Sequence, residues 1–405
     1  MSHFEVLIPV VLFLLMASAE VVEKNCGNSK NKVCVPRILC DNGAVIRDGR
    51  ALFSFRTLLD GNEGCDTTEV CCAITDKVDT PIVPLDVSTP TECGHRNEMG
   101  LHTTMTDSAD VAQVGEFPWM VALLRKSDKS YLKAGTLIGS DVVLTAAHVV
   151  FNLQAGEFFV RAGEWDFSIE TEFYRHVDVD VRLIERHPDF QKSSGANNLA
   201  LLFLSTRINP QPHISPACLP RANRNFDHSR CFVSGWGKKT FSSSSYMNIL
   251  KKVEVPVVGR ELCQQQLRRT ILGSYFEIDS SLICAGGERG RDACKGDGGA
   301  PLVCPLANDN RRYEQAGIVN WGIGCGDQNT PALYTNVALF REWIDLKVSE
   351  KSVSRSNFDS GTGGTGSVNN GGCSHKIWSV LVGSNLNIQI NNLSNKSKEP
   401  AMIPK

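Results

Sequence analysis

The chain has 405 residues, a net charge of −2 and 21% charged residues, which is long enough for two or three domains. The near-neutral net charge and the lack of a block of basic residues exclude a nucleic-acid-binding protein and a polybasic membrane-binding patch. Its 15 cysteines predict a disulfide framework if the chain is secreted, and the odd number leaves at least one cysteine without an intrachain partner. Zinc is the competing interpretation, but no Cys-x₂-Cys pairs recur with partners at zinc spacing.

Residues 1–19 have the pattern of a signal peptide. An apolar run at 7–16 is followed by Ala17-Ser18-Ala19, so cleavage is expected after Ala19 and the protein is expected to be secreted and extracellular. The run is well short of the roughly 20 apolar residues that cross a bilayer. No later segment is longer, so the sequence predicts no transmembrane segment.

Residues 20–72 form a small cysteine-rich unit. A unit this short buries little apolar surface, so disulfides must hold it together. Residues 73–92 contain three prolines and are expected to be a linker. The cysteines of the unit are Cys26, Cys34, Cys40, Cys65, Cys71 and Cys72.

Residues 93–348 predict an all-β domain. Short β-rich runs are broken by Gly, Pro and Asn, and helical spacing is clear only at Val337, Phe340, Ile344 and Val348. Residues 349–405 are rich in Ser, Gly and Asn and are expected to be disordered and without a role in function. Cys373 lies there as the odd cysteine, and both an interchain disulfide and a free thiol remain open.

Three segments resemble the catalytic motifs of trypsin-type serine proteases. They are TAAH at 145–148, NNLALL at 197–202 and DACKGDGGAP at 292–301. His148 matches the general base, but Asn198 stands at the position of the orienting aspartate and Gly298 at that of the nucleophilic serine. Glycine cannot form an acyl-enzyme, and a neutral amide does not stabilise an imidazolium. We therefore interpret His148 as a retained structural residue.

Further motifs extend this resemblance over residues 93–348. They are FPW at 117–119, CFVSGWG at 231–237 and WGIGCG at 321–326. The resemblance implies a trypsin-like double β-barrel with a C-terminal helix. It also places Asp292, Trp321, Gly322 and Ala332 at the specificity pocket. Ala332 stands where the family usually has glycine, and the added methyl group is expected to narrow the slot.

The cysteine spacing of the small unit resembles the clip domain of arthropod proteases. Together with Gly298, GWGKK at 235–239 and LKKVEVP at 250–256, it resembles the clip-domain serine protease homologs, which include phenoloxidase-activating factor II and masquerade-like proteins. The usual disulfide of the histidine loop is absent, with Ala134 and Val149 at its positions, so that loop is expected to be less constrained. The resemblance implies the pairs Cys26–Cys71, Cys34–Cys65, Cys40–Cys72, Cys93–Cys218, Cys231–Cys304, Cys263–Cys284 and Cys294–Cys325.

Asp297 matches the residue that pairs with a new amino terminus after zymogen cleavage. Residues 100–106 contain no Arg, no Lys and no Ile-Val-Gly-Gly-like start, so the usual activation bond is missing. Asp297 is therefore expected to lack an ammonium partner. Arg47, Arg50 and Arg56 of the clip unit are candidate cleavage sites, against the alternative of solvated surface charges.

Glu164, Asp166, Glu170 and Glu172 crowd a loop that binds calcium in some members of the family. Oxygen ligands in a loop suit Ca²⁺, although acidic loops are usually only solvated. No other metal or cofactor is expected.

The resemblance implies a secreted, non-catalytic cofactor or regulator of prophenoloxidase activation and melanisation, in an innate immune protease cascade. Its expected partners are prophenoloxidase, clip-domain serine proteases or both. The alternatives are a microbe-surface recognition protein, a competitive negative regulator and a weakly active serine endopeptidase. Sequence alone does not separate them, because a fold does not specify the binding sites it carries.

Overall fold

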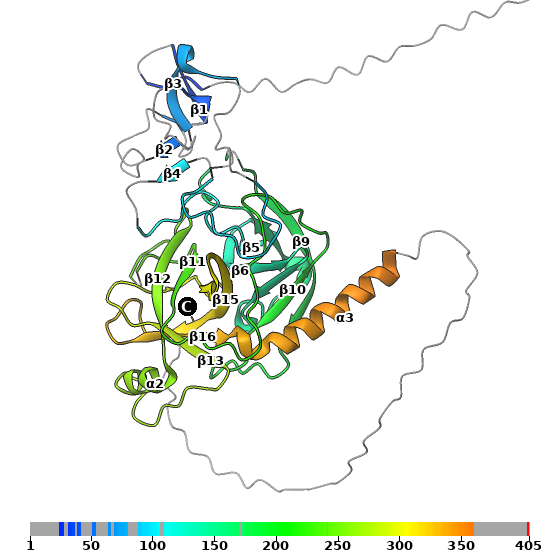
Figure 1. Cartoon of the computed structure of the whole chain (residues 1–405), viewed down its shortest axis with the longest axis vertical. Coiled ribbons are helices and arrows are strands. Elements are labelled where there is room, and N and C mark those ends of the chain that lie inside the picture. Colours follow the sequence, from blue (N-terminus) through cyan, green and yellow to red (C-terminus); the bar gives the residue numbers. More distant parts are fainter. Residues whose placement is uncertain are drawn as a thin grey trace, which may run out of the picture.

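The computed structural model describes most residues from Lys24 to Asp359, and then Ile403 and Pro404. Within that span the gaps are 28–30, 37–38, 42–50, 54–63, 66–68, 80–87, 102, 106–108, 170–171, 173 and 241, and the remaining undescribed positions are 1–23, 360–402 and 405. The expected signal peptide therefore lies outside the described residues, as do Arg47, Arg50, Arg56, Glu170 and Cys373. Figure 1 shows the small N-terminal unit above a larger two-part β-domain.

The first half of the large domain is a closed six-stranded antiparallel barrel, in the order β10-β7-β6-β5-β8-β9. Strand β9 shows how the sequence builds it, because Val179 and Val181 are buried inside while Asp178 and Asp180 are exposed. The strands are β5 (Met120–Arg125), β6 (Tyr131–Gly139), β7 (Val142–Thr145), β8 (Phe158–Ala162), β9 (Val177–Arg186) and β10 (Ala200–Leu204).

The second half is a sheet in the order β14-β11-β12-β13-β16-β15, which closes through the pairing of β14 with β15. A seventh strand, β17, adds to β15. The all-β double barrel that the sequence predicts is confirmed. The strands are β11 (Arg230–Gly235), β12 (Lys251–Val258), β13 (Leu282–Gly286), β14 (Pro301–Leu306), β15 (Asp309–Gly322), β16 (Pro331–Asn336) and β17 (Ile403–Pro404).

In the part of the chain that the structure describes, helices α2 and α3 accompany the barrels (Figure 1). Helix α3 (Arg341–Asp359) follows the 3₁₀ turn η5 (Val337–Phe340), and its residue Ile344 is fully buried. The terminal helix is confirmed, and it continues to Asp359, because 349–359 contains no Pro or Gly to end it. Helix α2 (Arg260–Arg268) was not predicted, since it buries only Cys263 and Leu267. Among the described residues, no helix is both long and apolar enough to cross a bilayer.

The small unit is built on two antiparallel strands, β1 (Lys32–Pro36) and β3 (Glu69–Ala73). It extends beyond the predicted end at 72, because η2 (Ile74–Asp76) follows β3 and the Val78 amide donates to the Leu39 carbonyl at 3.0 Å. In addition, β2 (Ala51–Phe53) pairs in parallel with β4 (Thr103–Met105), which lies just before the barrels. The clip unit is thus joined by backbone pairing to the segment in which a trypsin-type protease would be cleaved.

The described residues contain seven disulfides, and they are the pairs that the resemblance implies. They are Cys26–Cys71, Cys34–Cys65, Cys40–Cys72, Cys93–Cys218, Cys231–Cys304, Cys263–Cys284 and Cys294–Cys325. At the missing histidine-loop disulfide, Ala134 is buried and its carbonyl accepts a hydrogen bond from Thr145 Oγ1 at 2.9 Å. This hydrogen bond joins β6 to the end of β7, just before the histidine loop.

Candidate functional site

The three positions that correspond to a catalytic triad lie at the junction of the two barrels. His148 is on η3 (Ala147–Val149) after β7, Asn198 precedes β10, and Gly298 is buried in the loop before β14. A cavity of about 210 Å³ opens between His148 and Trp321. It is lined by His148, Phe190, Lys192, Ser193, Gly195, Asn198, Asn320 and Trp321. The structure therefore brings the base and acid positions together, beside a cleft.

The hydrogen bonds of Asn198 fix the tautomer of His148. Asn198 Oδ1 accepts from the backbone amide of His148 at 2.9 Å, and Asn198 Nδ2 lies 2.8 Å from His148 Nδ1. Because an amide nitrogen can only donate, Nδ1 accepts and the proton of the neutral ring is on Nε2. A general base at this site needs its lone pair on Nε2 to take the proton of the nucleophile. The amide thus holds the ring in the tautomer that cannot act as base.

Asn198 is itself held by a neighbouring amide. Its Nδ2 also donates to Asn320 Oδ1 at 2.6 Å, and Asn320 Nδ2 donates to the Gly195 carbonyl at 2.8 Å. All these groups are buried, so the orientation of the Asn198 amide is determined by its partners.

The electrostatics of the cleft further disfavour a charged imidazole. Burial, followed by the nearby Lys133 ammonium, lowers the pKa of His148 to about 4. Burial also lowers the pKa of Lys133 to about 8. His148 Nε2 is buried and has no hydrogen-bond partner among the described residues. The role of Lys133 cannot be inferred from the sequence, because its proximity to His148 depends on how the first barrel closes.

Asp297 contradicts the expectation that it lacks an ammonium partner. Its side chain is fully buried and forms an ion pair with Lys251 Nζ, and it accepts hydrogen bonds from the amides of Gly237 at 2.9 Å and Cys294 at 2.8 Å. The expectation was wrong because it considered only a new amino terminus. Pairing of Lys251 with Gly235 at the start of β12 brings an ammonium to the carboxylate from within the uncleaved chain.

Lys252, which follows Lys251 in β12, stabilises a second buried carboxylate, that of Glu116. Lys252 Nζ lies 2.8 Å from Glu116 Oε2, and Glu116 also accepts from Arg96 Nε at 2.9 Å. Glu116 is fully buried, and it links β12 to the segment that enters the first barrel. The consecutive lysines at 251 and 252 thus each neutralise one buried acid. In the sequence the two lysines belong to the motif at 250–256, which does not indicate their role.

The residues of the expected specificity pocket lie around the end of β15. Asp292 accepts a hydrogen bond from the Gly326 amide at 3.1 Å, and Trp321 Nε1 donates to the Ser194 carbonyl at 3.1 Å. Ala332 is buried in β16 opposite Ala285. The specificity pocket and its narrowing by Ala332 both stay predictions.

The expected calcium loop is partly neutralised by the protein itself. Glu164 is bonded to Arg161 Nη1 at 3.2 Å, while Asp166 Oδ2 is buried and has no hydrogen-bond partner among the described residues. Burial and the neighbouring Glu164 raise the pKa of Glu172 to about 9. In the described part of the chain, the one cluster of three metal-ligand-type side chains is Cys26, Cys34 and Cys65, and all three are in disulfides. Calcium binding therefore stays a prediction.

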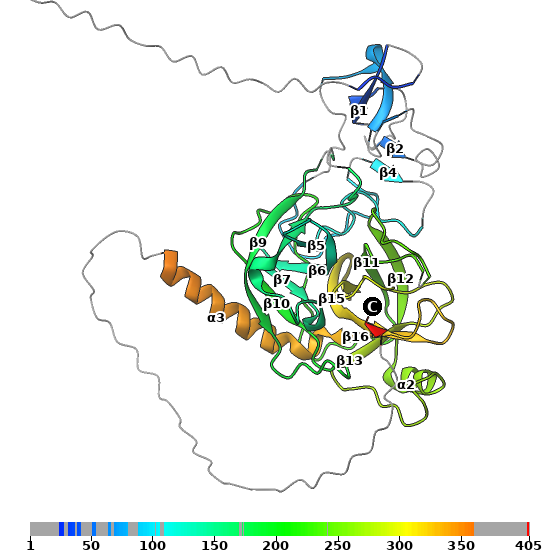
Figure 2. The ribbon, with the colours of Figure 1, turned by 180° about the vertical axis from the view of Figure 1, so that it is seen from behind.

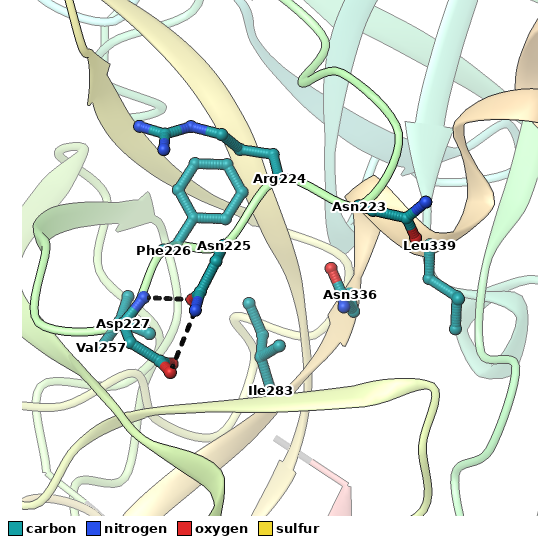
Figure 3. A pocket seen from close by; sticks show the side chains of 9 residues that line it. All are labelled: Asn223, Arg224, Asn225, Phe226, Asp227, Val257, Ile283, Asn336 and Leu339. Atoms are coloured by element: carbon teal, nitrogen blue, oxygen red, sulfur yellow. Dashed lines mark hydrogen bonds between the residues drawn. The ribbon is translucent and has the colours of Figure 1, made fainter.

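A second cavity of about 250 Å³ lies between the loop at 223–227 and η5. Figure 3 shows Ile283 between Asn225 and Asn336, and Leu339 on the far side of Asn336. The backbone amide of Asp227 donates to Asn225 Oδ1 at 2.8 Å. None of its lining residues is a Ser, Cys or His, so it does not have the components of a nucleophile–base pair. No sequence motif marks it.

Comparison with known families assigns both parts of the chain. The trypsin family matches residues 107–344, and the family described as the serine protease clip domain of PPAF-2 matches residues 22–73. The chain is a clip-domain member of the trypsin family. The resemblance stated from the motifs is thereby confirmed.

Its relatives include both phenoloxidase-activating factors and proteins named as inactive. The clip-domain protein is 46% identical over 288 residues to phenoloxidase-activating factor 2 of Galleria mellonella, covering 68% of this chain and 94% of the relative. It is 36% identical to inactive CLIP domain-containing serine protease A8 of Anopheles gambiae, covering 78% of this chain and 88% of the relative. It is 34% identical to inactive CLIP domain-containing serine protease A28 of the same species, covering 86% and 97%.

We predict that Asn198→Asp raises the pKa of His148 by roughly 1–3 units, because a carboxylate stabilises the imidazolium. In the unchanged protein, the pKa of His148 is about 4 in the folded state and 6.5 in the unfolded chain, so the unfolded chain binds a proton first as the pH falls. The free energy of unfolding therefore has the full contribution of the neutral ring above pH 6.5 and loses it as the pH falls towards 4. NMR titration of the histidine ring measures the pKa of His148 in the unchanged protein and in Asn198→Asp. Asn225→Asp, in the separate cavity of Figure 3, is the control and should leave His148 unchanged. An unaltered His148 in Asn198→Asp would contradict the assigned contact.

We predict that Lys251→Met lowers the free energy of unfolding by about 3–5 kcal/mol, because it leaves the Asp297 carboxylate buried without a counter-ion. Chemical denaturation of the uncleaved protein measures this loss. The exposed Lys239→Met is the matched control and should stay within about 0.5 kcal/mol of the unchanged protein. Adding Asp297→Asn to Lys251→Met removes the charge and should recover part of the loss. A loss below about 1 kcal/mol in Lys251→Met would overturn the role given to the pair.

We predict that Ca²⁺ raises the melting temperature, since a cation would relieve both the unpartnered Asp166 oxygen and the neutral Glu172 carboxyl. At ten times the dissociation constant the gain is ~1.4 kcal/mol, and extracellular calcium sites have dissociation constants up to about 1 mM. Thermal unfolding with Ca²⁺ or with a chelator measures it, and Asp166→Asn should remove the difference. No shift at about 10 mM Ca²⁺ would show that the loop is only solvated.

Proposed function

We propose that the chain is a secreted, non-catalytic regulator of an arthropod extracellular protease cascade, acting as a cofactor in prophenoloxidase activation and melanisation. The observation that carries the proposal is the combination of Gly298 with the Asn198–His148 hydrogen bond. The first removes the nucleophile, and the second holds the base in the wrong tautomer.

The chain lacks a nucleophile at position 298, but it keeps the contacts that hold the loop around that position. Asp297 keeps a counter-ion and two amide donors, and the Cys294–Cys325 disulfide ties its loop to the end of β15. This supports a role in binding, because a rigid cleft without a nucleophile can present a surface but cannot cleave.

The named relatives support the cascade and the partners. Phenoloxidase-activating factors are named for what they activate, and this chain shares 46% identity with one of them over most of that protein's length. We therefore expect the partners to be prophenoloxidase, a clip-domain serine protease or both. A signal peptide at 1–19 would deliver the protein to the extracellular fluid.

The clip unit supports regulation by cleavage outside the barrels. The segment 51–53 of the clip unit pairs with 103–105, and the three candidate arginines lie within the same clip stretch between Cys40 and Cys65. A nick in that stretch would leave the pieces joined by disulfides while changing this contact.

The function is tested by reconstitution. Prophenoloxidase and its activating protease are incubated with and without the uncleaved and protease-treated chain, and phenoloxidase activity is measured. We expect the chain to raise that activity, and Gly298→Ala to act like the unchanged protein, because the effect needs no turnover. A fall in activity would instead identify a competitive negative regulator. No effect in either form would overturn the cofactor role.

The absence of peptidase chemistry is tested separately with a labelled fluorophosphonate. The unchanged chain should not be labelled, and Gly298→Ser alone should remain poor, because Asn198 still fixes the wrong tautomer; the corresponding amide costs about 10⁴ in turnover in chymotrypsin-type enzymes. The double variant Gly298→Ser with Asn198→Asp is the positive control for restoring the pair. Labelling of the unchanged chain would refute the proposal.

A further inference from the structure

The cavity of Figure 3 lies against the second barrel and shares no lining residue with the cleft at His148. Two of its side chains come from neighbouring strands, Ile283 from β13 and Asn336 from the end of β16, and Figure 2 shows these strands side by side. The loop at 223–227, Val257 of β12 and Leu339 of η5 complete the lining. Paired strands therefore hold part of the wall in place.

The side chain of Asn336 has an unused hydrogen-bond acceptor. Asn336 is the N-cap residue of η5, a position at which an asparagine oxygen commonly accepts a hydrogen bond from a following backbone amide, yet its side chain forms no such cap. Its Oδ1 is buried and has no hydrogen-bond partner among the described residues. Burial of an acceptor without a partner is unfavourable, so a donor from a ligand would stabilise this atom.

A second asparagine of the cavity is also available to a ligand. Asn223 is exposed, and its side chain forms no hydrogen bond within the described part of the chain. Asn225, by contrast, is engaged with Asp227, because its Oδ1 accepts from the Asp227 amide at 2.8 Å and its Nδ2 donates to Asp227 Oδ2 at 3.3 Å. The amides of Asn223 and Asn336 each offer a ligand one acceptor oxygen and two N–H donors.

The charges around the cavity disfavour an ionic ligand. Asp227 would repel an anion, and Arg224 would repel a cation. Arg224 is itself held in place, since its Nε donates to Glu314 Oε1 at 3.2 Å and its guanidinium carbon lies 5.3 Å from the centroid of the Phe226 ring. With one charge of each sign in the lining, a neutral ligand fits best.

Aliphatic side chains provide the apolar part of the lining. Val257 is buried, Ile283 is half-buried and Leu339 is 46% exposed. Packing of C–H groups of a ligand against Ile283 and Leu339 would remove apolar surface from water, which is favourable. The volume of about 250 Å³ is below the roughly 300–1,000 Å³ of sites for drug-sized ligands, so the cavity suits one small chemical unit.

The backbone at the cavity does not favour a peptide added as a strand, because its amides are already paired. The Asn336 amide donates to the Ser281 carbonyl at 2.8 Å, and the Asn223 amide donates to the Ala338 carbonyl at 3.3 Å. Recognition at this place therefore depends on side chains.

We propose that this cavity is a glycan-binding site that accepts one neutral saccharide unit. A hydroxyl both donates and accepts, so neighbouring hydroxyls of a sugar can donate to the oxygens and accept from the nitrogens of the Asn223 and Asn336 amides. The C–H face of the sugar ring packs against Ile283 and Leu339. The site gives the chain a binding function that is separate from the cleft and does not rest on the role in the protease cascade.

The test uses the full chain and no partner protein. The probes are the methyl glycosides of glucose, galactose, mannose and N-acetylglucosamine, added one at a time. Methyl NMR of protein labelled at Ile and Leu reports on Ile283 and Leu339, and each titration gives a dissociation constant. Nα-acetyl-lysine methylamide tests the competing occupant, a basic side chain attracted by Asp227.

Two variants remove an amide with little change to the backbone. Asn336→Leu replaces the amide by an apolar group of similar size, and Asn223→Gly removes it at a residue whose φ is 60°, a conformation that glycine adopts without strain. Asn308→Leu, at the exposed turn between β14 and β15, is the matched control. Circular dichroism and thermal unfolding verify that each variant is folded.

We expect at least one glycoside to shift the methyl signals of Ile283 and Leu339, with a dissociation constant on the order of 1 mM because the ligand is small. Asn336→Leu and Asn223→Gly should each weaken its binding about 5- to 10-fold through the loss of hydrogen bonds, whereas Asn308→Leu should not. No shift with any of the four glycosides would overturn the proposal, as would unchanged affinity in both amide variants. Shifts with the lysine derivative alone would overturn it in favour of a pocket for a basic side chain.

Discussion

The buried ion pair between Lys251 and Asp297 is the interaction on which the cleft depends. Asp297 lies in the loop that carries Gly298, between the disulfide at Cys294 and the start of β14. A fully buried carboxylate is very costly unless it is paired and hydrogen-bonded, and here it has an ammonium and two amide donors. The pair therefore lets the uncleaved chain hold this loop against β12, without a new amino terminus.

The same framework is compatible with the proposed absence of protease chemistry. The loop position of the nucleophile is kept by the Asp297 contacts, while Gly298 supplies no reactive atom. Asn198 still contacts His148, but it donates to Nδ1 where a carboxylate would accept, so one change from acid to amide reverses the ring tautomer. Burial and Lys133 then keep the ring neutral. The proposal that this cleft binds and does not cleave rests on these groups.

The family resemblance that the motifs and cysteine spacing carry implied the double barrel and the disulfide pairs, because such motifs reflect contacts that recur with the same residue types. The helical spacing of four apolar residues predicted the terminal helix. The role of Lys251 escaped prediction, since it depends on its register opposite Gly235, and a sequence does not state which of many lysines reaches a given acid. The effect of Lys133 on His148 was not predicted, because the two residues meet only when the first barrel closes. Helix α2 was not predicted, because it buries too few residues to show a clear helical period. The pairing of residues 403–404 escaped because composition reports whether a segment can build a core, not whether it can join an existing sheet edge.

The most direct test of this account is amide hydrogen exchange in the uncleaved chain at Gly237 and Cys294, whose N–H groups donate to Asp297. The account predicts strong protection of both amides in the unchanged protein. It also predicts that Lys251→Met weakens this protection while the fold of the first barrel is retained. Rapid exchange of both amides in the unchanged, uncleaved protein would contradict it, because the cleft framework would then not be held by the internal ion pair.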